Sequence, residues 1–150
     1  MGVAKAFTLV PLPPDEAFDL WTDVRRWPTF VDGFAHPDRT DPSWPQEGAK
    51  LVWKSVPGGR GLVTERVIAS TPATLFETVV LEEKLDGTQT VAFAPIEDGT
   101  RVDMQLDYKV HVGGPLRPLI DVLFIRRAQN EALARTLRRF TTEATEQSAL

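Results

Sequence analysis

The stretch "RVDMQLDYKVHVGGPLRPLIDVLFIRRAQNEALARTLRRF", residues 101–140, contains the two elements that decide the fold. Its first part alternates between apolar and polar residues, which is the two-residue period of a half-buried β-strand. The apolar positions expected to share one face are Val102, Met104, Leu106, Tyr108, Val110 and Val112. After a Gly-Gly-Pro break the period changes to that of an α-helix, which we expect over residues 118–144.

Upstream of this strand the chain contains further segments with β-rich composition, separated by short turn sequences. We expect strands at residues 3–10, 49–56, 61–69, 74–83 and 88–97, followed by the strand at 100–112. The separators "PGGRG", "STPA", "LDG" and "EDG" predict tight turns, so consecutive strands should pair as an antiparallel meander. Residues 35–48 are proline-rich and carry no periodicity, which predicts a long loop of the kind that often covers a site.

Two short helices are expected between the first strand and this loop. Pro13 and Pro14 favour a helix start, and the acidic residues after them complement its positive end. Asp23 is typical of an N-cap for a second helix at residues 24–27, which Pro28 disfavours continuing. In this segment the aromatic side chains should pack or line a wall, whereas Arg25 and Arg26 should point to solvent.

The composition is that of an ordinary globular chain. With 150 residues, 42% hydrophobic and 25% charged, we expect one domain spanning residues 1–150. The formal net charge of −4 argues against a general nucleic-acid binder. The lack of cysteine excludes disulfides and thiolate chemistry. No apolar run reaches the roughly 18 residues needed to span a membrane, and we expect a cytoplasmic protein.

The order of elements predicts an α+β architecture in which one sheet wraps around one long helix. Six antiparallel strands would curve around one long C-terminal helix, and the two short helices after the first strand would close one end. A sheet bent around a single helix need not fill its interior with side chains. The sequence therefore predicts a cavity between the sheet and the C-terminal helix.

At this point the chain resembles the START/Bet v 1-like SRPBCC superfamily, and within it the polyketide cyclase/dehydrase type. The resemblance is carried by "PPDEAFDLWTDVRRWPTFV", "GRGLVTERVIASTPATLFE", "EDGTRVDMQLDYKV" and "GPLRPLIDVLFIRRAQNEALARTLRRF", and it covers nearly the whole chain. It implies a helix-grip fold with a hydrophobic ligand cavity. Members of this superfamily include aromatase/cyclases of polyketide pathways, lipid carriers and hormone receptors.

Candidate ligand-binding residues are the apolar and polar side chains expected to face that cavity. They are Trp27, Phe30, Trp53, Phe93, Met104, Tyr108, Leu123, Arg126 and Asn130. Asn130 lies in the middle of the helix stripe and Arg126 near its edge, where a polar group needs either a protein partner or a ligand. The same two alternatives apply to the Tyr108 hydroxyl. Either it is hydrogen-bonded within the core, or it donates a hydrogen bond to a carbonyl group of the ligand.

Candidate catalytic residues are Tyr108, Glu65, Arg66 and Glu77. The turn at 70–73 would set Arg66 opposite Glu77 and Glu65 opposite Thr78. The Arg66–Glu77 pair would be an exposed cross-strand pair on one face, or a buried dyad if that face lines the cavity. Only one of the two faces can do so, and both alternatives stand at this point because a one-residue register shift exchanges them.

Other kinds of site are not expected. His36 falls in the proline-rich loop and His111 on a polar strand face, so we expect no metal site and no cofactor. The serines lack a nucleophile-elbow context, and "GGRG" at 58–61 is not followed by a phosphate-binding helix. The apolar surface around Phe124 fits three placements, namely against the long loop, at the cavity mouth or in a homodimer contact.

Three functions remain on this reading. The first is the binding of a hydrophobic or aromatic small molecule, lipid or polyketide-like, in the cavity. The second is an aromatase/cyclase that promotes aldol closure and dehydration, with Tyr108, Arg66 or Arg126 polarising a ketone and Glu65 or Glu77 as acid or base. The third is a regulatory partner protein that uses the surface around Phe124.

Overall fold

The computed structural model describes residues 2–111 and 124–150, and it has the expected α+β helix-grip fold. Its described strands form one antiparallel sheet in the order β1-β7-β6-β5-β4-β3-β2. The strands are β1 (Gly2–Val10), β2 (Phe34–Thr40), β3 (Lys50–Ser55), β4 (Leu62–Thr71), β5 (Leu75–Leu81), β6 (Leu85–Ile96) and β7 (Gly99–Val110). The helices are α1 (Pro14–Thr22), the 3-10 turn η1 (Val24–Arg26), α2 (Trp27–Phe30) and α4 (Arg126–Ser148).

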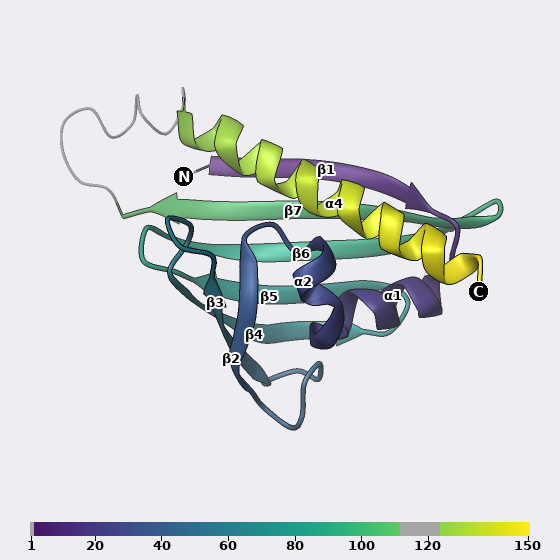
Figure 1. The fold of residues 1–150 in the computed structure, drawn as a ribbon, viewed down its shortest axis with the longest axis horizontal. Helices are drawn as coiled ribbons and strands as arrows, with labels where there is room; N and C mark the ends of the chain where they lie inside the picture. The colour runs from purple at the N-terminus through teal and green to yellow at the C-terminus, as the bar shows by residue number, and fades with distance from the viewer. Residues whose placement is uncertain (1, 112–123) are drawn as a thin grey trace.

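The long helix α4 lies across one end of the sheet, over β1 and β7, and α1 and α2 cover the middle strands (Figure 1). Along α4 the buried positions recur at helical spacing and face the sheet. They are Leu133, Thr136, Leu137, Phe140 and Ala144. The observed helix continues to Ser148, beyond the predicted end at residue 144. The first residues of the predicted helix, 118–123, lie outside the described part of the chain.

The alternating stretch of β7 confirms the prediction that decided the fold. Val102, Met104, Leu106, Tyr108 and Val110 are all buried on the inner face of the sheet. The residues between them are exposed or half-buried on the outer face. β7 is an interior strand of the sheet, because it pairs with β1 on one side and with β6 on the other.

The predicted loop at 35–48 contains a seventh strand that the sequence analysis missed. β2 pairs with β3 at the edge of the sheet, from Phe34 opposite Ser55 to Thr40 opposite Leu51. Five of its seven residues are exposed, and its register shifts twice around Pro37. An edge strand tolerates proline and bulges because it needs hydrogen bonds on one side only. The prediction of six strands was wrong for this reason.

Two local boundaries also differ from the prediction. Pro28 does not end the second short helix but lies in the first turn of α2, where a missing N–H removes no helical hydrogen bond. The turn assigned to "LDG" lies earlier, because Leu85 already pairs with Val110 and Gly87 with Tyr108. The predicted N-cap is confirmed, since the Asp23 carboxylate accepts a hydrogen bond of 3.2 Å from the Arg25 N–H.

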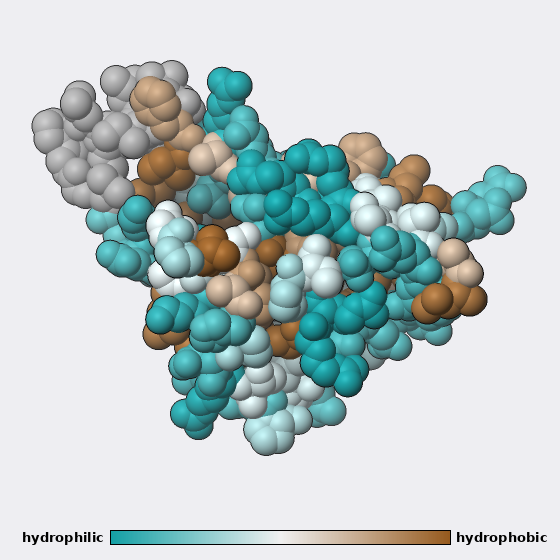
Figure 2. Space-filling view, in the orientation of Figure 1, coloured by the Kyte–Doolittle hydropathy of each residue, from teal (hydrophilic) through white to brown (hydrophobic). Residues whose placement is uncertain are grey.

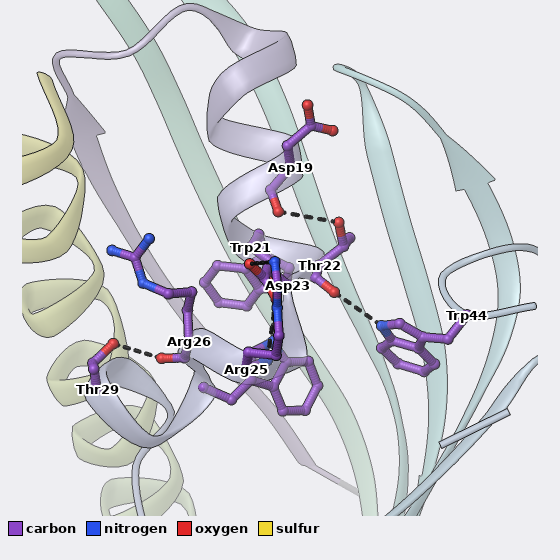
Figure 3. A network of polar contacts seen from close by, with 9 residues as sticks. Asp19, Trp21, Thr22, Asp23, Arg25, Arg26, Thr29 and Trp44 are labelled. Atoms are coloured by element: carbon purple, nitrogen blue, oxygen red, sulfur yellow. Dashed lines mark hydrogen bonds and ion pairs between the residues drawn. The ribbon is translucent and has the colours of Figure 1, made fainter. Parts of the chain in front are cut away.

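Aromatic packing and polar contacts join the short helices to the rest of the molecule. Trp27 Nε1 donates to the carbonyl oxygen of Trp21 at 2.8 Å. Trp44 Nε1 donates to the carbonyl oxygen of Thr22 at 2.9 Å (Figure 3). Arg25 is exposed, as expected, and it also forms an ion pair with Asp23. No described helix is long and apolar enough to cross a membrane.

Arg26 does not point freely to solvent as predicted. Its Nη2 donates to Oε2 of Glu143 at 2.6 Å, and this ion pair ties η1 to α4. The two neighbouring arginines therefore have different roles. Arg25 stays within its own turn, whereas Arg26 reaches the long helix.

Candidate functional site

A cavity of about 130 Å³ lies between the inner face of the sheet and α4. Its described lining comes from the short helices, the loop after them, the turn between β3 and β4, the strands β4, β6 and β7, and the helix α4. The lining residues are Trp21, Trp27, Val31, Asp32, Arg60, Glu65, Gln89, Met104, Leu106, Gln129, Ala132, Leu133 and Thr136. Figure 2 shows hydrophobic surface beneath the polar outer face of α4, on the side where α2 and β2 lie.

Glu65 places a buried carboxyl group on the wall of this cavity. The side chain comes from β4, and the residue is 4% exposed. Trp53 Nε1 donates to its Oε2 at 2.8 Å, and Thr78 Oγ1 donates to its Oε1 at 3.0 Å. Burial raises the pKa of this carboxyl above its usual value, although the two donors and the nearby positive charge of Arg60 act in the opposite direction. Glu65 is thus a group that retains its proton to higher pH than a glutamate in water.

The structure also settles which face of the β4–β5 hairpin lines the cavity. Glu65 points inward, whereas Arg66 is exposed on the outer face opposite Val79. Glu77 also lies on the outer face, where it accepts a hydrogen bond of 2.6 Å from Thr90 Oγ1. The predicted Arg66–Glu77 pair was therefore wrong.

The predicted register failed because β4 is longer than expected and carries an irregularity. β4 continues to Thr71 opposite Leu75, so the turn lies at 72–74 and not at 70–73. The register then shifts between Val67 and Ala69, which sets Ala69 opposite Glu77. Thr78 pairs with Val67 and reaches Glu65 diagonally on the same face.

Arg60 brings a positive charge to the same cavity from the turn between β3 and β4. The hydroxyl of Ser55 accepts hydrogen bonds from the backbone N–H groups of Arg60 and Gly61, at 2.7 and 2.9 Å, and so fixes this turn. The guanidinium carbon lies 5.0 Å from the centre of the Trp53 ring. Its Nε donates to Oε2 of Glu82 at 2.6 Å. Arg60 was not predicted as a site residue, because the sequence "PGGRG" indicates only a turn.

Asp32 closes another side of the cavity by joining the loop after α2 to the long helix. Its carboxylate accepts two hydrogen bonds from Arg135, at 3.0 and 3.1 Å, and one of 3.4 Å from Arg139. Its backbone N–H donates to Thr136 Oγ1 at 2.9 Å. The next residue, Gly33, has a φ of +77°, which glycine adopts without strain. These contacts hold the loop against α4.

Trp21 contributes an unpaired donor to the lining. The residue is 2% exposed, and its Nε1 is buried without a hydrogen-bond acceptor among the described residues. A buried N–H without an acceptor costs free energy, so an acceptor that reached this nitrogen would be bound favourably. Its ring also packs on Phe30 and Phe140, with centroids 5.4 and 5.0 Å away.

The predicted apolar ligand-binding residues fall into three groups. Trp27 and Met104 line the cavity, and Leu123 lies outside the described residues. Phe30, Trp53 and Phe93 are buried in the surrounding core and do not belong to the described lining. Trp53 still acts on the site indirectly, because its indole nitrogen holds the Glu65 carboxyl.

The polar candidates near the long helix lie elsewhere. Tyr108 is 2% exposed, and its ring packs against the backbone of Gly2 on β1 rather than on the described cavity wall. Asn130 Oδ1 accepts a hydrogen bond of 2.9 Å from the N–H of Lys5, so it caps the edge strand β1. Arg126 is exposed at the start of α4. Phe124, next to it, is 67% exposed.

The cavity offers hydrogen-bonding and acid–base groups rather than metal ligands. Across residues 2–111 and 124–150 no group of three His, Asp or Glu side chains converges in a way that could hold a metal ion. The arrangement can enclose a small, partly aromatic molecule, donate hydrogen bonds to it from Arg60 and Trp21, and give or take a proton at Glu65.

Comparisons with known proteins agree with this geometry at the level of family and fold. The family model described as "Polyketide cyclase / dehydrase and lipid transport" matches residues 1–145. The di-domain ARO/CYC StfQ from the steffimycin biosynthetic pathway is 14% identical, with a TM-score of 0.72 over 99% of this chain and 52% of that chain. DynU16, a putative protein in the dynemicin biosynthetic locus, is 16% identical, with a TM-score of 0.63 over 96% of this chain and 49% of that chain.

A solved structure of similar length has the same fold. Protein CV1439 from Chromobacterium violaceum is 11% identical, with a TM-score of 0.68 over 96% of this chain and 98% of that chain. A search of curated proteins gave no match. At these identities the structural likeness concerns the fold alone, and the site must be argued from its own residues.

Proposed function

Because this chain belongs to the polyketide cyclase / dehydrase and lipid transport family, we propose that it binds a small aromatic or ketide-like molecule between its sheet and α4. The observation that carries the proposal is the cavity itself, in which Trp21, Trp27 and Met104 stand beside the polar groups of Arg60 and Glu65. Small-molecule sites commonly combine an apolar wall with a few fixed polar groups in this way.

The size of the cavity restricts the ligand. Its volume of about 130 Å³ lies below the several hundred Å³ typical of drug-sized pockets. We therefore expect the enclosed part of the ligand to be one or two fused rings or a chain of similar bulk. A longer molecule would need the wall to move, most directly at the loop that Asp32 holds against Arg135.

Blocking the cavity tests this proposal. Ala132 lines it from α4, so Ala132→Leu should fill the space without removing any polar group. Ala128→Leu makes the same change at an exposed position of the same helix. Naphthalene-sized compounds should raise the melting temperature of the native protein and of Ala128→Leu, but much less that of Ala132→Leu. Equal shifts in all three proteins would contradict binding in the cavity.

A second function, cyclisation or dehydration of a ketide, is favoured by the buried carboxyl of Glu65. As a carbon–carbon bond forms to a ketone, its oxygen would take the Glu65 proton, and the carboxylate would then accept the proton released by the attacking enol. The raised pKa of Glu65 supports this role because it keeps the proton available to a higher pH than in a glutamate exposed to water. The StfQ and DynU16 likenesses make the reaction worth testing.

Binding and catalysis can be separated at the same residue. Glu65→Gln keeps the size and the acceptor oxygen of the side chain but cannot transfer a proton. If the chain is a cyclase, this variant should bind a ketide surrogate with similar affinity and lose turnover. If the chain only binds, neither protein should turn over the surrogate. Turnover that survives in Glu65→Gln would exclude Glu65 as the acid.

A further inference from the structure

The Arg60 end of the cavity is organised to present a cation. The backbone of the β3–β4 turn is held by the Ser55 hydroxyl, and Gly58 and Gly61 adopt φ values of +80° and +71°. Trp53 supports one face of the guanidinium group at 5.0 Å. The side chain of Arg60 is 33% exposed, so most of it is withdrawn from water. The turn thus fixes a cation on the cavity wall.

Arg60 has hydrogen-bonding capacity that the described protein does not use. A guanidinium group carries five N–H bonds, and only Nε–H has an acceptor among the described residues, namely Oε2 of Glu82. The two Nη groups remain for an acceptor that enters the cavity. Two parallel N–H groups of this kind match the two oxygens of a carboxylate.

The other groups on the cavity wall fit an acceptor-rich ligand as well. Trp21 Nε1 is a buried donor without an acceptor among the described residues. Both oxygens of Glu65 already accept hydrogen bonds, from Trp53 and Thr78, and burial raises the pKa of this carboxyl, which disfavours a negative charge there. The carboxylate of Asp32 is already bound by Arg135 and Arg139. Among Arg60, Trp21, Glu65 and Asp32, donors therefore exceed free acceptors.

We infer that the ligand carries an anionic oxygen, as in an aromatic carboxylate, phenolate or enolate, and that this oxygen binds the Nη groups of Arg60. The inference rests on the proposed function, because it assigns the chemical class of the molecule that the same cavity takes. Glu82 is the competitor in this arrangement. Its carboxylate, 6% exposed in the side chain, partly neutralises Arg60 and so sets how strongly the ligand is held.

The test compares an acid with its neutral isostere. Dissociation constants of 2-naphthoate and 2-naphthamide, measured by calorimetry at one ionic strength, should differ by about tenfold or more in favour of the acid, as expected for a charge-assisted hydrogen bond. Arg60→Gln should remove this preference. Glu82→Gln should increase it, because Arg60 then loses its negative partner. Arg101→Gln, at an exposed arginine on the outer face of β7, is the matched control and should leave the preference unchanged.

The possible outcomes separate the two proposals. If both compounds bind the native protein equally, the inference is wrong while binding in the cavity stands. If neither compound binds, the proposed function fails and the inference fails with it. A preference that persists in Arg60→Gln would place the anion elsewhere. If Arg60→Gln is poorly folded, Arg60→Lys and Glu82→Gln provide the test instead. Lysine keeps the positive charge but lacks the two parallel N–H groups of arginine, so Arg60→Lys should show an intermediate preference for the acid.

Discussion

The indole nitrogen of Trp53 donates a hydrogen bond of 2.8 Å to Oε2 of Glu65, and both residues are buried. A tryptophan on β3 thereby orients a carboxyl group on β4 toward a cavity. The bond matters because an isolated buried carboxyl would have no fixed direction. With Thr78 on the other oxygen, the group is held in one place, as a proton donor or a ligand contact requires.

The stability of the protein should depend on pH through Glu65. Burial raises its folded pKa above the unfolded value of 4.5, against the influence of Trp53, Arg60 and Thr78, and Glu82 raises it further. The folded state then holds the proton more tightly, so this stabilisation is complete below pH 4.5 and is lost as the pH rises through the folded pKa. Glu65→Gln has no proton to lose, so its melting temperature relative to the native protein should rise as the pH increases from 4.5 to the folded pKa and should level off above it.

The same change at an exposed carboxyl serves as the reference for this experiment. Glu97 lies exposed in the turn between β6 and β7, away from any helix end, so Glu97→Gln alters a charge in water alone. Melting temperatures of the three proteins are compared across one pH series in a single buffer system. A difference between Glu65→Gln and the native protein that stays flat or falls as the pH rises would contradict the buried-carboxyl account.

Phe140 should be one of the residues on which the fold depends most. It is fully buried and packs edge-on against Trp21 and Phe30, at centroid distances of 5.0 and 5.1 Å. Phe140→Ala should lower the free energy of unfolding by about 3–5 kcal/mol, measured by urea denaturation. Phe124→Ala removes the same side chain from a site that is 67% exposed and should cost less than about 0.5 kcal/mol. Equal losses would show that α4 is packed differently.

The Asp32–Arg135 contact should contribute modestly to stability. The Asp32 side chain is 24% exposed and that of Arg135 is 40% exposed, so water screens the pair. We expect Asp32→Asn to cost about 0.5–1 kcal/mol in unfolding free energy, while Asp19→Asn, at an exposed position on α1, should cost less. Hydrogen exchange at the amide of Asp32, which donates to Thr136, should also become faster. Unchanged exchange would mean that this loop is held by other contacts.

Asn130 should matter for the edge of the sheet and not for the ligand. Its Oδ1 accepts the N–H of Lys5, and removing it leaves a backbone donor of β1 open to water. In Asn130→Ala the Lys5 amide should exchange faster by NMR, and the affinity for 2-naphthoate should stay the same. A loss of affinity for 2-naphthoate without faster exchange of the Lys5 amide would indicate that Asn130 faces the cavity, as the sequence pattern had suggested.

Much of the fold could be predicted because it follows from local periodicity. β7 alternates over its whole length, and the apolar stripe of α4 recurs at helical spacing, so both were recognisable from residue type alone. β2 was missed because an exposed edge strand with Pro37 and two register shifts lacks any alternating pattern. The formation of β2 depends on its pairing with β3, and this pairing is a tertiary contact.

The site was less predictable than the fold for a related reason. Glu65 and Arg66 are adjacent, and a register change of one residue decides which of them faces inward. The irregularity between Val67 and Ala69 and the position of the turn set that register, and neither has a clear signal in the sequence. Arg60 was overlooked because turn residues are normally solvated, whereas here the Ser55 hydroxyl turns the chain back toward the cavity.

The central claim, that a small molecule occupies the space between the sheet and α4, is tested most directly by intermolecular NOEs to bound 2-naphthoate. The account predicts contacts from the naphthalene ring to the Met104 methyl group and to the Trp21 indole, two residues that line the cavity from β7 and α1. Contacts confined to Phe7 or Phe124, which are exposed on the surface, would contradict it.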